Sequence, residues 1–369
     1  MLLENFQKFI LILLYGSLIL LSYIALANPM RVNKKANQFF GFFLLYWSIY
    51  WIVNILEICG IYISDFLRFI FLYAQIFTPI FLYYSVVFYT NPSYKFQKKD
   101  AICLIIPLIY FVLLIFSKKN QNLYALINFI SIFHNLPYIT IVYFKIVFFQ
   151  KKLKTFSSNT ENIDLKWLKR MSLLLFYTII ITVCYELFNF FVYKMHQHLV
   201  MDFLFLIIVY SSAYHILQQK EIYPIDKNER EVLLSLELES ETIKENKKQL
   251  IPDDEFEELK QKLSLLMDND MPYLNGELNL LKLSDLLEIT SHELSYLINN
   301  GFNENFFQFV NKYRVEYAKK ILKNPTRKKD SMLSIAFESG FNSKTSFNTI
   351  FKKITNLTPT EFRNKFSDL

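Results

Sequence analysis

A series of seven apolar runs within the first 217 residues constrains the fold of this chain more than any other feature. Most of the runs reach the ~20 residues that a helix needs to cross the ~30 Å hydrocarbon core of a bilayer. A segment in hydrocarbon must satisfy its own backbone polar groups, so runs of this length predict helices. We therefore expect an all-α chain that opens with a polytopic transmembrane bundle of about seven spans. The runs are Phe6–Leu26, Phe39–Ile58, Leu67–Tyr89, Ala101–Phe116, Leu123–Phe149, Met171–Tyr193 and Leu199–Leu217.

Basic residues in the loops predict the orientation of these spans. If the amino terminus lies outside, the inner loops hold 12 Lys and Arg residues and the outer segments hold five. This bias predicts a multi-pass protein of the cell membrane with its carboxy-terminal part in the cytoplasm. The alternative is cleavage after Ala25-Leu26-Ala27, which resembles a signal-peptidase site. The apolar run before it is longer than a usual signal core, and Glu4 balances Lys8, so we expect an uncleaved first span.

A few polar side chains fall at membrane depth, where they are costly unless they are paired or functional. Glu186 and Asn189 lie one helical turn apart in the middle of a span. His134 and Asn135, together with Pro137, interrupt the fifth run. The candidates for an intramembrane ligand site or polar network are His134, Asn135, Glu186 and Asn189. The plainer interpretation is hydrogen bonding between helices. No metal-ligand spacing and no nucleophile–base pattern is present, so we expect no catalytic residues, metal or cofactor.

Charge divides the chain into three blocks. Residues 1–217 hold 18 Lys and Arg against 8 Asp and Glu, residues 218–270 hold 8 against 15, and residues 271–369 hold 14 against 10. We expect a transmembrane sensory or anchoring domain, a charged and mostly helical linker, and a separate carboxy-terminal domain. In the linker, periodicity does not decide between strand and helix around Val232–Leu238. Asp254 and Glu257 form a capping-box pattern, which predicts a helix over Glu255–Met267.

The carboxy-terminal block contains two helix–turn–helix patterns. In the first, LKLSDLLEITSHELSYLINN, Thr290 and Glu293 form a capping box ahead of the second helix. The side chains left facing outward on that helix are His292, Ser295, Tyr296 and Asn299. In the second, LSIAFESGFNSKTSFNTIFKKI, Gly340 supplies a turn residue and Ser343 a cap. The outward side chains there are Lys344, Thr345, Asn348 and Thr349.

A long helix, Glu304–Lys323, is expected between the two patterns. About 20 residues at 1.5 Å each give a helix of ~30 Å. That length suits two recognition helices placed about one DNA turn, ~34 Å, apart. Two recognition helices in one chain would then reach adjacent major grooves, and the chain would not need to dimerise to do so.

The region Met271–Arg363 resembles the AraC/XylS-type DNA-binding domain. The resemblance rests on LINNGFNENFFQFVNKYRVEYAKKIL and, more strongly, on IAFESGFNSKTSFNTIFKKITNLTPTEFR. The whole arrangement, many spans followed by this domain, is similar to membrane-bound regulators of the family. Four positions depart from the pattern: Ser284 where Ala is usual, Glu288 and Asn356 where Gly is usual, and Tyr296 where a cation is frequent.

The resemblance implies base contacts from seven of these outward residues, namely His292, Ser295, Tyr296, Lys344, Thr345, Asn348 and Thr349. Lys344 suits a guanine edge or a phosphate, and Asn348 suits adenine. Phosphate contacts are expected from Lys352, Lys353 and Arg363, for which exposure to solvent is the alternative. Arg314, on the connecting helix, is expected to be structural.

These observations predict a membrane-anchored, sequence-specific transcription regulator that is not an enzyme. Its expected partners are double-stranded DNA, the lipid bilayer, an unidentified small-molecule or protein signal, and RNA polymerase. The rival interpretation is a membrane receptor or transporter whose tail does not bind DNA specifically. An enzyme in the membrane block is a further rival, disfavoured because no catalytic constellation is visible.

Overall fold

The computed structural model describes residues 2–117, 121–161, 163–191, 199–218, 220–222, 227–242 and 250–366. Within these ranges the regular structure is helical, with one isolated β-bridge between Ser157 and Asn279. The chain forms two compact units. The first unit comprises Met1–Phe149 and Leu165–Ile222, and the second comprises Gln150–Asp164 and Tyr223–Leu369.

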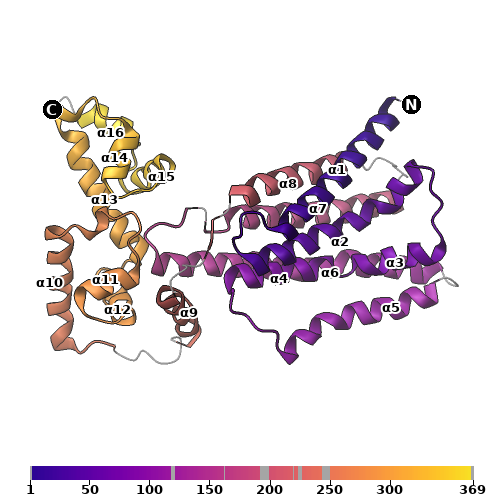
Figure 1. Ribbon diagram of the computed structural model, residues 1–369, viewed down its shortest axis with the longest axis horizontal. Coiled ribbons are helices and arrows are strands. Elements are labelled where there is room, and N and C mark those ends of the chain that lie inside the picture. Colours follow the sequence, from indigo (N-terminus) through magenta and orange to yellow (C-terminus); the bar gives the residue numbers. More distant parts are fainter. Residues whose placement is uncertain are drawn as a thin grey trace. The chain divides into compact units, whose positions relative to one another are not determined.

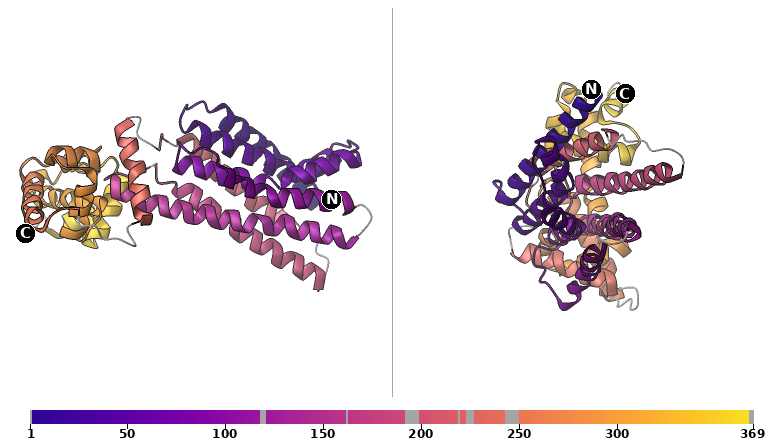
Figure 2. Two further views of the ribbon diagram at one scale, coloured as in Figure 1. Left: turned by 90° about the horizontal axis from the view of Figure 1, so that it is seen from below. Right: turned by 90° about the vertical axis from the view of Figure 1, so that its right-hand side faces the viewer.

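The helices of the first unit run side by side along a common direction, as the views in Figures 1 and 2 show. The part of the chain that the structure describes contains seven helical segments long and apolar enough to cross a membrane, which confirms the expected spans in length and composition. The helices are α1 (Leu2–Ala27), α2 (Lys34–Ile58), α3 (Asp65–Gln75), α4 (Thr78–Thr90), α5 (Ile105–Ser117), α6 (Gln121–Phe156), α7 (Lys166–Phe191) and α8 (Leu199–Gln218).

The third expected span, Leu67–Tyr89, is not one continuous helix. It is divided into α3 and α4 by a turn at Ile76 and Phe77. Pro79 stands in the first turn of α4, and it cannot donate a backbone hydrogen bond to the preceding turn. The fourth span begins with a 3₁₀ helix, η1 (Lys98–Leu104), before α5. By contrast, α6 continues as helix through Pro137.

Small residues let α1 and α2 approach closely. A Cβ atom on Gly41 would lie 2.6 Å from Cγ of Leu26, so a larger residue there would push the helices apart. Ser22 donates a hydrogen bond to the carbonyl of Gly41 at 2.9 Å, and Ser85 of α4 donates to the carbonyl of Ala36 at 3.0 Å. Such contacts are typical of helix packing in membranes, where the hydrophobic effect does not drive association.

The part of the linker that the structure describes is mostly helical. The region left undecided by periodicity lies in α9 (Lys227–Thr242), whose Leu233 is fully buried. The next helix, α10 (Asp253–Asn269), begins two residues earlier than expected, with Pro252 as its N-cap. The capping box expected from Asp254 and Glu257 is therefore wrong, because Asp254 already lies inside the first turn.

The carboxy-terminal region contains α11 (Leu280–Leu287), α12 (Ser291–Gly301), α13 (Phe306–Lys323), α14 (Met332–Glu338), α15 (Lys344–Thr355) and α16 (Pro359–Phe366). The long helix α13 stands between the pairs α11–α12 and α14–α15 in the chain, and it packs against both α12 and α14–α16. Its carboxy-terminal half shares a core with α14, α15 and α16. That core includes Ala318, Ile335, Phe347, Phe351 and Phe362.

Candidate nucleic-acid interface

The pair α14–α15 is held in place by two caps and a glycine turn. Ser331 accepts a hydrogen bond from the amide of Ser334, and Ser343 accepts one from the amide of Ser346 at 3.1 Å. Gly340 has φ +82°, and a Cβ atom there would lie 2.3 Å from the carbonyl oxygen of Tyr273. The turn thus requires glycine both for its backbone conformation and for the close approach of that carbonyl.

The outer face of α15 carries the polar residues that the sequence predicts. Phe347, Ile350 and Phe351 bury the inner face of the helix. Lys344, Thr345 and Thr349 are exposed, and Asn348 is half-buried on the same side. Their donors and acceptors match those of base edges and phosphates. This face can therefore make both kinds of DNA contact.

The three expected phosphate contacts lie in different environments. Lys352 and Lys353 are exposed in the last turn of α15. Arg363 of α16 instead donates hydrogen bonds to the carbonyls of Lys328 and Asp330, at 3.2 and 2.9 Å. These bonds tie α16 to the loop ahead of α14.

The pair α11–α12 has the expected capping box: the amide of Thr290 donates to the Glu293 carboxylate at 2.7 Å, and the amide of Glu293 donates to Thr290 Oγ1 at 3.2 Å. Glu288 adopts the left-handed conformation, φ 61°, where the family usually has glycine. Ser284, the other departure in this pair, is buried with its hydroxyl 3.0 Å from that of Ser291. The helix pair accommodates both changes.

The residues of α12 that are expected to contact bases are not fully open to solvent. His292, Ser295 and Tyr296 are all half-buried. Nε2 of His292 lies 3.4 Å from Oγ of Ser235 on α9, and the ring of Tyr296 packs edge-on against Phe256 of α10, with centroids 6.1 Å apart. The structure therefore does not place these three residues on an open surface, whereas it does so for the exposed residues of α15.

Arg314 is the most buried charged side chain of the second unit among the residues that the structure describes, with 1% of its surface exposed. Its guanidinium donates to the carbonyls of Tyr273 and Asn275, at 2.7 and 2.9 Å. Burial lowers the pKa of Arg314 to about 10. It is still charged at neutral pH, and its structural role is confirmed.

Arg314 also holds the loop between α6 and α7, residues 157–165, called here the α6–α7 loop. Its guanidinium donates to Oγ of Ser158 at 3.0 Å and contacts the carbonyl of the same residue at 3.4 Å. Asn311 donates to that carbonyl at 3.0 Å, and Ser158 donates its hydroxyl to the carbonyl of Leu278 at 2.6 Å. Ser158 is 1% exposed, so this part of the loop belongs to the core of the second unit.

The same loop reaches the start of α15. The hydroxyl of Ser343, the N-cap of that helix, donates to a carboxylate oxygen of Glu161 at 2.5 Å. The positive end of a helix is a favourable place for an anion. The Glu161 carboxylate lies at this end of α15, next to the residues that are expected to contact DNA.

Sequence reasoning missed the α6–α7 loop because nothing in its composition distinguishes it from an ordinary cytoplasmic loop. Ser158 contributes one hydroxyl and its backbone groups, and such contacts leave no charge or hydropathy pattern. The available hint was Arg314, since a buried guanidinium requires several acceptors and the neighbouring sequence offers no obvious acidic partner.

Two carboxylates stabilise the surroundings of α14 and α16. Arg327 forms an ion pair with Glu338 at 2.6 Å, which lowers the pKa of that carboxyl group. Glu361 accepts a hydrogen bond from the amide of Thr358 at 2.7 Å, and this bond lowers the pKa of Glu361. Both interactions fix helix ends next to α15.

The expected intramembrane residues are only partly brought together. His134 is buried and packs edge-on against Tyr138, with ring centroids 5.0 Å apart. Asn135 donates to the carbonyl of Ser131 at 2.7 Å and lines a cavity in the first unit. The side chains of Glu186 and Asn189 lie outside the described residues. Within the described ranges, no group of three or more His, Cys, Asp or Glu side chains is placed to hold a metal ion.

Comparison with known proteins identifies a helix-turn-helix domain that includes α12 and α15. Residues 283–365 match the family model described as a helix-turn-helix domain. The resemblance of the carboxy-terminal domain to the AraC/XylS type is thereby confirmed. No solved structure matches the chain.

Two curated relatives are named as transcriptional regulators. The "uncharacterized transcriptional regulatory protein YesN" of Bacillus subtilis (strain 168) is 39% identical over 82 residues, which is 22% of this chain and 22% of the relative. The "uncharacterized HTH-type transcriptional regulator in cgkA 5′ region" of Pseudoalteromonas carrageenovora is 32% identical over 106 residues, 28% of this chain and 61% of the relative. The chain thus spans less than two thirds of the length of either relative.

Proposed function

We propose that this chain, whose carboxy-terminal domain is a helix-turn-helix domain of the AraC/XylS type, is a membrane-anchored, sequence-specific transcription regulator. The observation that carries the proposal is the exposed polar face of α15, Lys344, Thr345 and Thr349 with Asn348 beside them, within the matched domain. The names of the relatives support transcription regulation as its role.

Membrane anchoring is supported by the first unit. Its seven long apolar helical segments agree with the spans expected from hydropathy. The excess of basic residues in alternate loops favours an amino terminus outside and a DNA-binding domain in the cytoplasm. The location of DNA inside the cell favours the same orientation independently.

Reading of two adjacent major grooves is supported by the helix order. We propose that α11–α12 and α14–α15 are both helix–turn–helix units, with α12 and α15 as recognition helices. The 18 residues of α13 span about 27 Å, close to one DNA turn. Because α9 contacts His292 and α10 contacts Tyr296, we expect α15 to bind first and α12 to engage after these helices shift.

The proposal implies four partners. Double-stranded DNA contacts the second unit, and lipid surrounds the first. A signal of unidentified nature acts on the first unit, and RNA polymerase is recruited or blocked at the promoter. No reaction is catalysed, because the domain acts by binding alone.

The test uses the full chain reconstituted in lipid nanodiscs. The protein selects duplexes from a random pool at physiological salt, and the retained duplexes are sequenced over successive rounds. A single enriched motif is expected. Retention without enrichment, or no retention at all, would instead favour the receptor or transporter whose tail does not read DNA.

Asn348→Ala sharpens this test at one residue. Loss of a bidentate amide contact to adenine should weaken binding by ~1–3 kcal/mol and relax the preference at one base pair. The measurement is binding to the selected duplex and to its single-base variants. Asn364→Ala, at an exposed position of α16, is the matched control and should change neither quantity. Equal weakening on every duplex would show that Asn348 does not read a base.

A further inference from the structure

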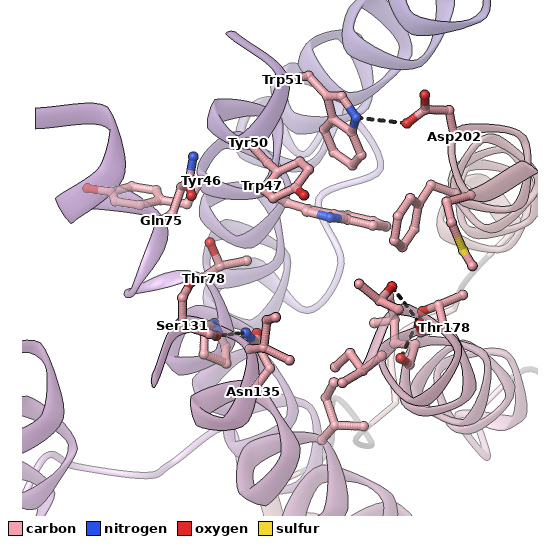
Figure 3. Close-up of a pocket in the computed structure, with 18 of the residues that line it drawn as sticks. Tyr46, Trp47, Tyr50, Trp51, Gln75, Thr78, Ser131, Asn135, Thr178 and Asp202 are labelled. Carbon is pink, nitrogen blue, oxygen red and sulfur yellow. Dashed lines mark hydrogen bonds between the residues drawn. The ribbon is translucent and has the colours of Figure 1, made fainter. Parts of the chain in front are cut away.

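A cavity of about 350 Å³ lies among the helices of the first unit, and Figure 3 shows part of its lining. Polar side chains in this lining already form hydrogen bonds within the protein. The indole of Trp51 donates to Asp202 at 3.0 Å. The hydroxyl of Thr178 donates to the carbonyl of Leu175 at 2.8 Å. These donors therefore do not require a ligand.

A smaller cavity, of about 70 Å³, lies between α7 and α8 of the same unit. Its polar lining comes from Trp167 and Arg170 on α7 and from Ser211, Ser212 and His215 on α8. A single water occupies ~10–15 Å³ of such space, so the cavity has room for a group of a few heavy atoms. Among the described residues that line it, none is acidic. The cavity therefore suits a small anionic group better than a cation.

The indole of Trp167 is held between other rings in the wall of this cavity. It packs edge-on against Phe40 of α2, with centroids 5.5 Å apart, and stacks on His215, with centroids 6.3 Å apart. Nε1 of Trp167 is buried, and no residue that the structure describes accepts a hydrogen bond from it. Buried indole N–H groups usually have a partner, because a buried donor without one is costly. This donor points to a ligand that carries an acceptor oxygen.

Positive charge gathers at the same ends of the two helices. Residues 165–170 and 215–222 hold four Lys and Arg residues against one acidic residue, Glu221. Glu221 accepts a hydrogen bond from the backbone amide of Asn33 at 2.8 Å. Arg170 is exposed and lines the cavity, and the ring of His215 carries at least one N–H donor in either tautomer. A guanidinium beside further N–H donors matches a phosphate group, whose oxygens accept several hydrogen bonds.

Apolar side chains continue from the cavity along both helices. On α7, Leu174 lies one turn beyond Arg170 and is 45% exposed. On α8, Ile207 lies one turn before Ser211 and is 49% exposed. Since residues four apart share one face of a helix, the polar cavity continues into an apolar surface. A molecule with a phosphate head and apolar chains matches both parts.

The depth of the cavity suits a lipid of the inner leaflet. The cavity lies near the start of α7 and the end of α8. In the orientation proposed above, these helix ends meet the cytoplasmic surface of the membrane. Anionic headgroups lie at that surface, and basic pockets between helices bind them. Trp is itself frequent at this depth.

We propose that this cavity binds the phosphodiester headgroup of an anionic glycerophospholipid from the inner leaflet. The indole of Trp167 and the ring of His215 donate to its oxygens, and the guanidinium of Arg170 neutralises its charge. The acyl chains lie along Leu174 and Ile207. This inference rests on the membrane anchoring in the proposed function and does not depend on DNA binding.

Native mass spectrometry of the full-length protein in an uncharged detergent measures which lipids it retains. The probes are palmitoyl-oleoyl phosphatidylglycerol, which is anionic, and phosphatidylcholine with the same chains, which carries no net charge. Glycerophosphoglycerol, the soluble headgroup of the first lipid, tests whether a free phosphodiester suffices. Phosphatidylglycerol should bind with at least about fivefold higher affinity than phosphatidylcholine, and the soluble headgroup should bind most weakly.

Two variants locate the binding. The preference for phosphatidylglycerol should be lost in R170Q, and also in S211D, which places a negative charge at an exposed position of the lining. The control R31Q makes the same chemical change as R170Q at an exposed position of the loop between α1 and α2, and it should keep the preference. Melting temperature in the same detergent shows that each variant is folded. Because Arg170 and Ser211 are both exposed, either variant alone can decide the location.

Equal retention of the two phospholipids would overturn this site, and so would an unchanged preference in R170Q or S211D or an equal loss in R31Q. A soluble headgroup that binds as tightly as the lipid would show that the occupant is not a lipid. A chain that stays in solution without detergent or lipid would overturn the membrane anchoring itself. Failure of duplex selection with the lipid preference intact would overturn the DNA-binding role and leave this site standing.

Discussion

Arg314 connects the interior of the DNA-binding domain to a distant part of the chain through single hydrogen bonds. Its guanidinium contacts carbonyls near α11 and both polar groups of Ser158. Sequence reasoning assigned it a structural role correctly, since it stands on the connecting helix among apolar positions. It did not identify Ser158, because a hydroxyl and a backbone carbonyl carry no pattern that links residues so far apart.

Arg314→Met should destabilise the second unit by roughly 3 kcal/mol or more, because several buried acceptors would lose a charged donor. The measurement is hydrogen exchange of α11, α13 and the α6–α7 loop in the full chain. Lys319→Met on the same helix is the control. Its surface ion pair with Glu316, at 2.8 Å, contributes at most about 1 kcal/mol, and exchange should stay close to that of the parent. Equal protection in both variants would contradict the role given to Arg314.

At the scale of elements, both candidate recognition helices are contacted by segments that lie outside the matched domain. α12 is contacted by α9 and α10, and the cap of α15 is bound by Glu161 of the α6–α7 loop. A carboxylate at this cap occupies a place that favours a DNA phosphate. If α15 contacts DNA as proposed, we expect the loop to compete with DNA at the start of this helix.

Glu161→Gln should raise the affinity for the selected duplex several-fold, because it removes a negative charge from the start of α15. Titration of duplex into nanodisc-bound protein measures the change at two salt concentrations. Glu258→Gln alters the same charge at an exposed position of α10 and controls for net charge. If both variants gain equally, the effect is a general one and the contact with Ser343 is not responsible.

Elements set by local sequence were largely predictable. The apolar runs predicted the seven spans, which the structure confirms in length and composition. Thr290, Gly340 and Ser343 predicted helix ends, and the structure confirms them as well. The division of the third span, the burial of Leu233 and the docking of the α6–α7 loop were not predicted. Each depends on packing between segments distant in sequence, which periodicity does not record.

At the scale of the whole molecule, the proposed orientation sets which side each loop occupies. A reporter protein active only in the cytoplasm, fused after Leu217, should be active, and an otherwise identical fusion in the loop after Ile58 should be inactive. The reason is the distribution of basic residues, which keeps their loops inside. Activity of both fusions, or of the second alone, would show that the seven-span topology is wrong.

The chain passes between the two units at three places, because residues 150–164 belong to the second unit while the helices on either side belong to the first. A protease that cut once after α8 would therefore free a fragment without Ser158, and Arg314 would lose two of its acceptor contacts. Because it lacks these contacts, such a fragment is poorly suited to act as a freely diffusing regulator. If the chain is anchored in the membrane as proposed and works as a whole molecule, its search for DNA is confined to the inner surface of the membrane, and the genes it controls must themselves visit that surface.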